Sequence, residues 1–184
     1  IFHGTFRDVV QVTPLVVSSY LCSLDKETVV LGADAYDTLF SSLSKQHSIL
    51  DTFDKLKSNF IWSAEANMWP SASSMPSYVG RFYRVREHSS PYRFLNYGGW
   101  IGKAGSACKI LRLCSRQLVK CTLCHSRSDK RKLPNQDQGA AHIVYTSTKR
   151  SRDMVLDYNQ KIFHPAYPSC KKLRVSEVGE VSVE

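Results

Sequence analysis

Several features that would indicate the compartment of this protein are missing from its sequence. No Asn-X-Ser/Thr acceptor occurs anywhere, so N-glycosylation gives no clue to secretion. No apolar run approaches the roughly 20 residues that a membrane-spanning helix needs, and no signal-like segment opens the chain. The first residue is Ile1 and not Met. We therefore expect a fragment or a trimmed chain, and the lack of a targeting segment says little about the compartment.

Acidic residues are in the minority. The 16 Asp and Glu against 25 Lys and Arg give a formal net charge of +9, which favours an anionic partner such as a nucleotide-sugar, nucleic acid or a polyanionic surface. The hydrophobic fraction of 42% and the charged fraction of 22% lie in the globular range. A chain of 184 residues is long enough for one domain with a real core.

Cysteine is too sparse, at six residues, for a disulfide scaffold of this length. Four of the six crowd into one short segment: Cys108, Cys114, Cys121 and Cys124. The string CTLCH at 121–125 matches a c-type haem attachment pattern, and the four thiols could be read as zinc ligands. Because only one C-x₂-C pair is present, we favour a disulfide within it or to Cys170, or buried thiols.

The chain is organised around residues 28–40, TVVLGADAYDTLF. Its apolar run passes through a glycine and an alanine into Asp34 and Asp37, which indicates a buried strand that delivers acids to its carboxyl end. Ligands bind at that edge in open α/β sheets. Two such carboxylates can share a divalent cation that holds a diphosphate. The alternative is a polar turn in which Asp37 caps the next helix.

Helix and strand patterns alternate around this stretch. We expect a helix within residues 7–24 that starts near Pro14, and an amphipathic helix at 39–57. The apolar segment 59–65 is the next strand, and it again ends in a carboxylate, Glu65. This order predicts an α/β fold with acids at the ends of two successive strands.

Three later segments complete the pattern. Residues 71–92, rich in Ser, Pro and Tyr, are expected to form a long surface loop. Residues 92–105 are strand-like, with a polar break at Asn96 and a glycine pair that permits close approach of a ligand or marks a bulge. Residues 105–132 predict a basic, cysteine-containing helix and loop, whose apolar face is Ile110, Leu111, Cys114, Leu118 and Cys121.

The patterns in the remaining C-terminal residues are weaker. Residues 139–148 suit either a helix or a strand on the same sheet. The tail, 171–184, has no strong core pattern and ends as a strand or as disorder.

Four sequence blocks occur together in an order that is more specific than any one of them. They are DAYDTLF at 34–40, SAE at 63–65 with MWP at 68–70, RFLNYGGWIG at 93–102, and NQDQ at 135–138. Over roughly residues 24–165 the chain resembles the glycosyltransferase domain of the procollagen lysyl hydroxylase family and its relatives. The segment LDYNQKIF at 156–163 is similar to the family's segment in which a Leu-Asp pair precedes a short strand.

The resemblance implies a GT-A-type α/β fold, a mixed sheet flanked by helices, in one domain over residues 1–184 that is incomplete at both ends. It implies a UDP-sugar donor, Mn²⁺, and transfer of a hexose to hydroxylysine of a collagen-like chain or to another protein acceptor. It also implies the endoplasmic reticulum or secretory pathway, with no membrane span in this chain. Nucleic acid is not expected as a partner on this interpretation.

Site residues follow from the resemblance by position. The metal ligands would be Asp34 and Asp37. The catalytic residues would be Glu65 and Asp137. The substrate-binding residues would be Tyr36, Trp69, Asn96, Gly98, Gly99 and Gln138.

The sequence also departs from the family's pattern. Tyr97 stands where a small residue is expected and would crowd the sugar pocket; residues 132–136 replace a run of acids, and Met68 replaces a cysteine. The family's third metal ligand, a histidine in an H-G-N-G-like segment, has no counterpart before Glu184. A second class therefore stays open: a catalytically impaired module that keeps the fold and binds an anionic ligand or nucleic acid.

Overall fold

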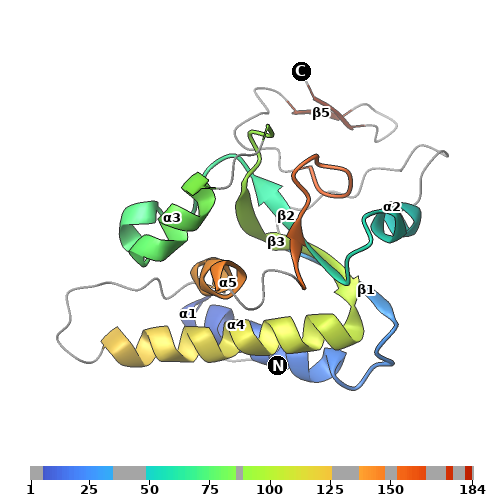
Figure 1. Ribbon diagram of the computed structural model, residues 1–184. Helices are drawn as coiled ribbons and strands as arrows, with labels where there is room; N and C mark the ends of the chain where they lie inside the picture. Colours follow the sequence, from blue (N-terminus) through green and yellow to red (C-terminus); the bar gives the residue numbers. More distant parts are fainter. Residues whose placement is uncertain are drawn as a thin grey trace.

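A computed structural model describes residues 6–34, 49–85, 89–125, 137–147, 153–164, 173–175 and 181–183. The described residues form a mixed α/β fold: a four-stranded sheet packed with helices, plus a separate two-stranded hairpin (Figure 1). The predicted fold class, a mixed sheet flanked by helices, is confirmed. No described helix is both long enough and apolar enough to cross a bilayer.

The sheet has the strand order β1-β3-β2-β4. Its strands are β1 (Val29–Ala33), β2 (Phe60–Glu65), β3 (Phe94–Lys103) and β4 (Val155–Leu156). Strand β3 is antiparallel to β1 and β2, and β4 is parallel to β2. Strands β1, β2 and β4 therefore point the same way, so that their carboxyl ends meet at one edge, where β3 begins. Asp34, which follows β1, and Glu65, the last residue of β2, therefore lie at the same edge.

Strand β1 lies at an end of the strand order and is half-buried, with its last residue exposed. The expectation of a buried strand was wrong here, because an edge strand has a neighbour on one side only. Gly32 is needed at this position, since a Cβ there would lie 2.1 Å from the indole Cε2 of Trp100. The close approach lets the ring of Trp100 stack on Phe60, with 5.5 Å between the ring centroids.

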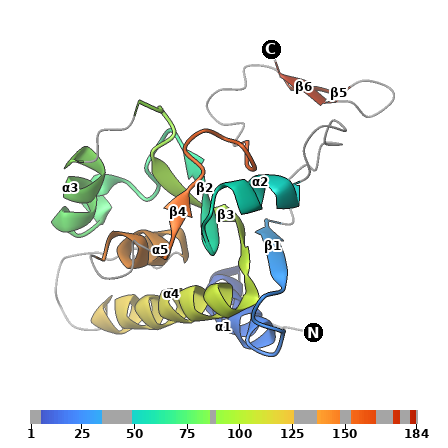
Figure 2. The same cartoon turned by 45° about the vertical axis from the view of Figure 1, so that its right-hand side comes forward.

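The two faces of the sheet carry different cores. Phe60, Trp62 and Ala64 of β2 face the main core, while Ile61 packs with Phe53 and Ile101 in a second cluster. This alternation is what a strand covered on both faces requires. Helices α1 (Phe6–Leu21), α4 (Ala104–His125) and α5 (Asp137–Thr146) lie on the main-core side, and α2 (Ile49–Lys55) lies on the opposite side (Figure 2). The amphipathic helix predicted at 39–57 is thus observed over its last part, and residues 35–48 lie outside the described residues.

The polar break predicted in the third strand is a bulge. Trp62 pairs with Trp100 but the next residue, Ser63, pairs with Asn96, so residues 97–99 are extra on β3. A bulge bends the strand and changes the direction of its side chains. The glycine pair lies inside this bulge, next to the edge where the acids meet.

Helix α1 (Phe6–Leu21) packs along α4 (Ala104–His125), as Figures 1 and 2 both show. The prediction of a helix in this region is confirmed, but α1 begins well before the expected start, with Pro14 inside it. On α4, the predicted apolar face is confirmed for Ile110, Leu111, Cys114 and Leu118, which are buried.

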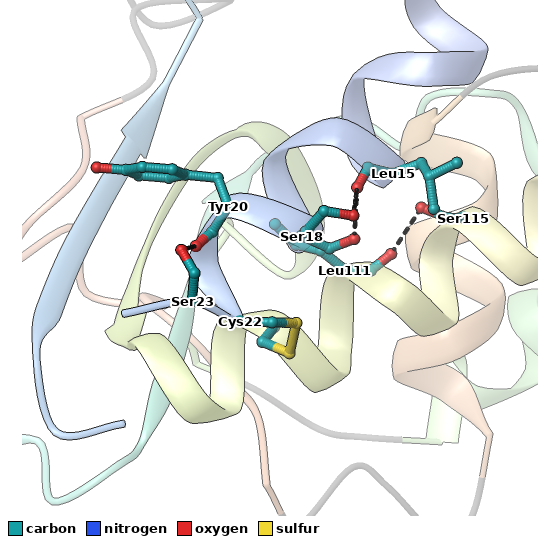
Figure 3. The surroundings of a disulfide bond; sticks show 9 residues. Leu15, Ser18, Tyr20, Cys22, Ser23, Leu111 and Ser115 are labelled. Carbon is teal, nitrogen blue, oxygen red and sulfur yellow. Dashed lines mark hydrogen bonds between the residues drawn. A yellow bond between two sulfur atoms is a disulfide. The ribbon is translucent and has the colours of Figure 1, made fainter. Parts of the chain in front are cut away.

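A disulfide bond joins Cys22, just after α1, to Cys108 in the second turn of α4 (Figure 3). Beside it, the hydroxyls of Ser18 and Ser115 donate to the carbonyls of Leu15 and Leu111, which satisfies both polar groups between the packed helices. The pairing of Cys108 rules it out as a zinc ligand. Cys114 is a buried thiol, as one of the expected alternatives required, and burial raises the pKa of that thiol. The side chains at 121–125 and Cys170 lie outside the described residues.

The long loop expected at 71–92 was wrong. The segment contains a 3₁₀ turn, Ala72–Ser74, and helix α3 (Ser77–Val85). Val79 and Tyr83, four residues apart, are buried, whereas Arg81 and Arg84 are exposed. This is an amphipathic face over little more than two turns, which the surrounding Ser, Pro and Tyr residues hide in the sequence. Residues 86–88 lie outside the described residues.

The described residues after 136 form one helix and three short strands. Residues 137–146 form helix α5 (Asp137–Thr146), which decides between the helix and the strand expected there. The short strand β4 precedes Asp157 instead of following it. Asp157 is buried, and its carboxylate accepts hydrogen bonds from the N–H groups of Lys161, Ile162 and Phe163. The tail contributes strands β5 (Leu173–Val175) and β6 (Val181–Val183), which pair with each other.

Candidate functional site at the carboxyl ends of the strands

Asp34 is the first residue after β1 and is exposed at the edge of the sheet. Its N–H donates to the carbonyl of Gly98 at 2.9 Å. A Cβ on Gly98 would lie 2.6 Å from Oδ2 of Asp34, so only glycine lets the bulge approach the carboxylate this closely. Asp37 and Tyr36, predicted as metal ligand and nucleotide contact, lie outside the described residues.

Glu65, the last residue of β2, is held in place by two amide side chains. Gln138 Nε2 donates to Oε1 at 2.6 Å, and Asn96 Nδ2 donates to Oε2 at 3.2 Å. Burial raises the pKa of Glu65, and these two hydrogen bonds oppose the rise. Both carboxylate oxygens therefore have fixed positions in a half-buried site.

Gln138 connects the elements of the site. Its Nε2 also donates to the carbonyl of Trp69 at 2.8 Å, and its Oε1 accepts the N–H of Tyr97 at 3.4 Å. Asn96 is fixed in a similar way, because its Oδ1 accepts the N–H of Gly98 at 2.8 Å. Both amide groups form hydrogen bonds within the protein, so these residues orient Glu65 and the bulge.

Asp137 begins α5, and its Oδ1 accepts the N–H of Gln138 at 2.7 Å. Burial raises the pKa of Asp137, the backbone hydrogen bond opposes the rise, and the negative charge of Asp34 adds to it. The carboxylates of Asp34 and Asp137 are therefore close enough to repel each other. A cation bound between them would relieve this repulsion.

The donor set fits a hard divalent cation, because carboxylate oxygens are the ligands that Mg²⁺ and Mn²⁺ accept. Within the part of the chain that the structure describes, no group of three His, Cys, Asp or Glu side chains is placed to hold a metal ion. Among the described residues, Asp34 and Asp137 supply two carboxylates to this site. Asp37 is not among the described residues.

Trp69 lies at the same edge with its side chain 59% exposed. Its carbonyl accepts hydrogen bonds from Gln138 and from Nε2 of His142, and the bond to Pro70 is cis. Trp69 is therefore not part of the hydrophobic core. An exposed ring on a fixed backbone can offer an apolar face to a sugar.

Two other predicted residues show packing roles. A Cβ on Gly99 would lie 2.8 Å from the ring of Phe163 and 3.1 Å from Cβ of Ser63, so this glycine gives room to the loop after β4. Tyr97, which we expected to crowd the sugar pocket, packs its ring on Trp62 against the main core, with 5.4 Å between the centroids. Burial raises the pKa of Tyr97 well above its usual value, so the phenol is neutral.

A buried pair behind Trp69 was missed by the sequence reasoning. His142, in α5, is fully buried; its Nδ1 lies 2.7 Å from the hydroxyl of Tyr83 in α3. Burial lowers the pKa of His142 to about 4, and the carbonyl of Trp69 opposes this shift. Nothing in the sequence marks His142, because it stands among apolar residues with no motif around it.

The fold and this cluster define an α/β protein with a polar site of carboxylates and amides beyond the ends of its strands. A sequence profile of the family described as PLOD GT domain matches residues 17–120, more than half of the chain. The chain belongs to this family of glycosyltransferase domains. The match includes Asp34, Glu65 and Asn96 and ends before Asp137, which was predicted from the NQDQ block. A search of curated proteins found no match.

Proposed function

We propose that the protein is a metal-dependent glycosyltransferase that moves a hexose from a UDP-sugar to a hydroxylysine-type acceptor of a collagen-like protein. Family membership supports the reaction class. The observation that carries the proposal is the arrangement of Glu65, which two amides hold at the sheet edge that also bears Asp34 and Asp137. We also propose that the protein acts in the secretory pathway, which only its family association suggests.

Asp34 and Asp37 are the residues that would hold Mn²⁺. The ion would neutralise the negative charge that develops on the departing diphosphate. Asp34 suits this role because it is exposed, oxygen-ligating and next to a glycine that leaves room for a ligand. Asp137, from α5, adds a further carboxylate near Asp34, and its raised pKa reflects burial and the charge of Asp34.

Glu65 is the base of the proposed reaction. The acceptor hydroxyl oxygen forms a bond to the anomeric carbon, the bond from that carbon to the diphosphate breaks, and UDP leaves with the electron pair. Glu65 takes the hydroxyl proton. Its raised pKa makes it a better proton acceptor than an exposed carboxylate, and its two amide partners keep it in position. Trp69 offers an apolar surface beside it.

The test measures UDP binding with and without Mn²⁺, and hexose transfer, in the intact protein. Asp34→Asn is expected to weaken Mn²⁺-dependent UDP binding. Glu65→Gln should leave that binding unchanged and slow transfer by about 10² to 10⁴-fold, since it removes a general base but keeps a similar shape. Asp54→Asn, which changes an exposed carboxylate on α2, is the matched control and should behave as wild type.

Two results would reject the proposal. One is UDP binding by wild type that does not depend on Mn²⁺, without any transfer. The other is the same loss in Asp54→Asn as in Asp34→Asn. Either would favour the second class, a module that keeps the fold and holds an anion through its net charge of +9.

A further inference from the structure

We propose that a pocket beside Trp69 binds an acidic side chain of the acceptor polypeptide, close in sequence to the residue that is modified. This inference rests on the proposed function, because it takes the acceptor to lie at Glu65 and Trp69. It adds a specificity for acceptors that carry a carboxylate near the modified residue.

The pocket lies between α3, the 3₁₀ turn and the start of β3, with a volume of about 530 Å³. Three apolar residues, called here the apolar floor, line it: Met68, Ala72 and Phe94. Tyr83 also lines the pocket. Such a floor accommodates the aliphatic part of a side chain. Two arginines, Arg84 and Arg93, line the same pocket together with Ser73 and Ser77.

These two guanidinium groups come from different elements. Arg84 is in the last turn of α3, and Arg93 directly precedes β3; both are exposed. The guanidinium of Arg93 lies 5.6 Å from the centroid of the Phe94 ring, a cation–π contact that keeps it at the pocket wall.

Among the residues that the structure describes, no acidic side chain forms an ion pair with either arginine. No Asp or Glu is among the lining residues, and the ion pair found within the described ranges is Lys103 with Glu27, which involves neither arginine. Two guanidinium groups at one pocket suit a carboxylate, which can accept paired hydrogen bonds from arginine. A carboxylate on a short aliphatic stem matches both the charge and the apolar floor.

The position of the pocket indicates which ligand supplies the carboxylate. Phe94 pairs with Glu65 in the sheet, and Met68 directly precedes Trp69, so the pocket adjoins the proposed acceptor site. Asp34 lies at Gly98, farther along β3 and inside the bulge. The proposed donor site at Asp34, the proposed acceptor site at Glu65 and the pocket therefore follow one another along β3.

A polypeptide whose hydroxyl reaches Glu65 has its neighbouring residues within reach of the pocket. An extended chain advances about 3.5 Å per residue, so the acidic side chain is expected within about three residues of the modified one. Nucleic acid is a poorer candidate, because phosphate binding calls for a track of cations with stacking rings, whereas two cations over an apolar floor suit one side chain.

The experiment uses labelled collagen-like peptides with hydroxylysine and with Asp, Asn or Lys two residues away. Binding to the intact protein is measured by fluorescence anisotropy without any sugar donor or metal. The Asp peptide is expected to bind about fivefold more tightly than the Asn peptide, the range of a partly exposed ion pair. Arg84→Gln and Arg93→Gln should each reduce this preference, and the double variant should abolish it.

Arg81→Gln is the matched control, because Arg81 is exposed on the same helix and does not line the pocket. It should keep the preference for Asp. In transfer assays with the Asp peptide, the variants at Arg84 and Arg93 are expected to raise KM and leave kcat unchanged, as for lost uniform binding.

Three outcomes would overturn the inference. They are equal binding of the Asp and Asn peptides by wild type, equal loss of preference in Arg81→Gln, and an RNA oligomer that displaces the peptide and depends on the same two arginines. Because anisotropy needs neither donor nor Mn²⁺, a protein that prefers the Asp peptide but never binds UDP would refute the proposed function while the pocket stands.

Discussion

Stability should depend on pH through His142, the buried histidine behind Trp69. A carbonyl can only accept, so Nε2 carries the proton that is donated to Trp69, and Nδ1 accepts the hydroxyl proton of Tyr83. The neutral imidazole therefore satisfies both contacts. Burial lowers the pKa of His142 from 6.5 to about 4.

The sign of the effect follows from proton binding. Between pH 6.5 and about 4, the unfolded chain binds a proton at His142 that the folded protein does not bind. The free energy of unfolding therefore falls as the pH falls through this range, and it is unaffected by His142 above it. The full shift corresponds to a loss on the order of 3 kcal/mol.

The assay is urea unfolding of wild type and His142→Gln over the same pH range. Wild type should lose stability more steeply than the variant as the pH is lowered. The raised pKa values of Glu65 and Asp137 act in the opposite direction, because folded carboxylates then bind protons first, but they act in both proteins and cancel in the difference. His164→Gln, at an exposed histidine, should follow wild type. Parallel curves for wild type and His142→Gln would refute the reasoning.

Two further predictions concern stability. Replacing Cys22 and Cys108 by serine should lower the free energy of unfolding by up to about 4 kcal/mol, since the bond closes a separation of 86 residues. A reducing agent should lower the urea midpoint of wild type more than that of the variant, and an unchanged midpoint in the variant would contradict the pairing. Asp157→Asn should cost about 2 kcal/mol, because an amide matches three backbone N–H donors less well than a carboxylate. Hydrogen exchange at Lys161, Ile162 and Phe163 should speed up, and unchanged protection would count against this role.

Much of the site could be predicted from the sequence, because its signals are local. Apolar runs that end in Asp34 and Glu65 indicate strands that carry acids to an edge, and the glycine pair after Asn96 indicates an irregular strand. The structure brings these residues together with Gln138 in one hydrogen-bonded cluster. Short-range patterns suffice here because strand direction and side-chain type are properties of a few neighbouring residues.

Tertiary structure alone decided how distant segments meet. The sequence does not indicate that β3 runs between β1 and β2, that Cys22 pairs with Cys108, or that Tyr83 meets His142 across 59 positions. Helix α3 was missed because its two buried side chains become recognisable only against the core that covers them. Local sequence patterns specify helices, strands and the chemical type of the site residues. Which segments contact one another is decided by packing over the whole chain, because this packing depends on contacts between residues far apart in sequence.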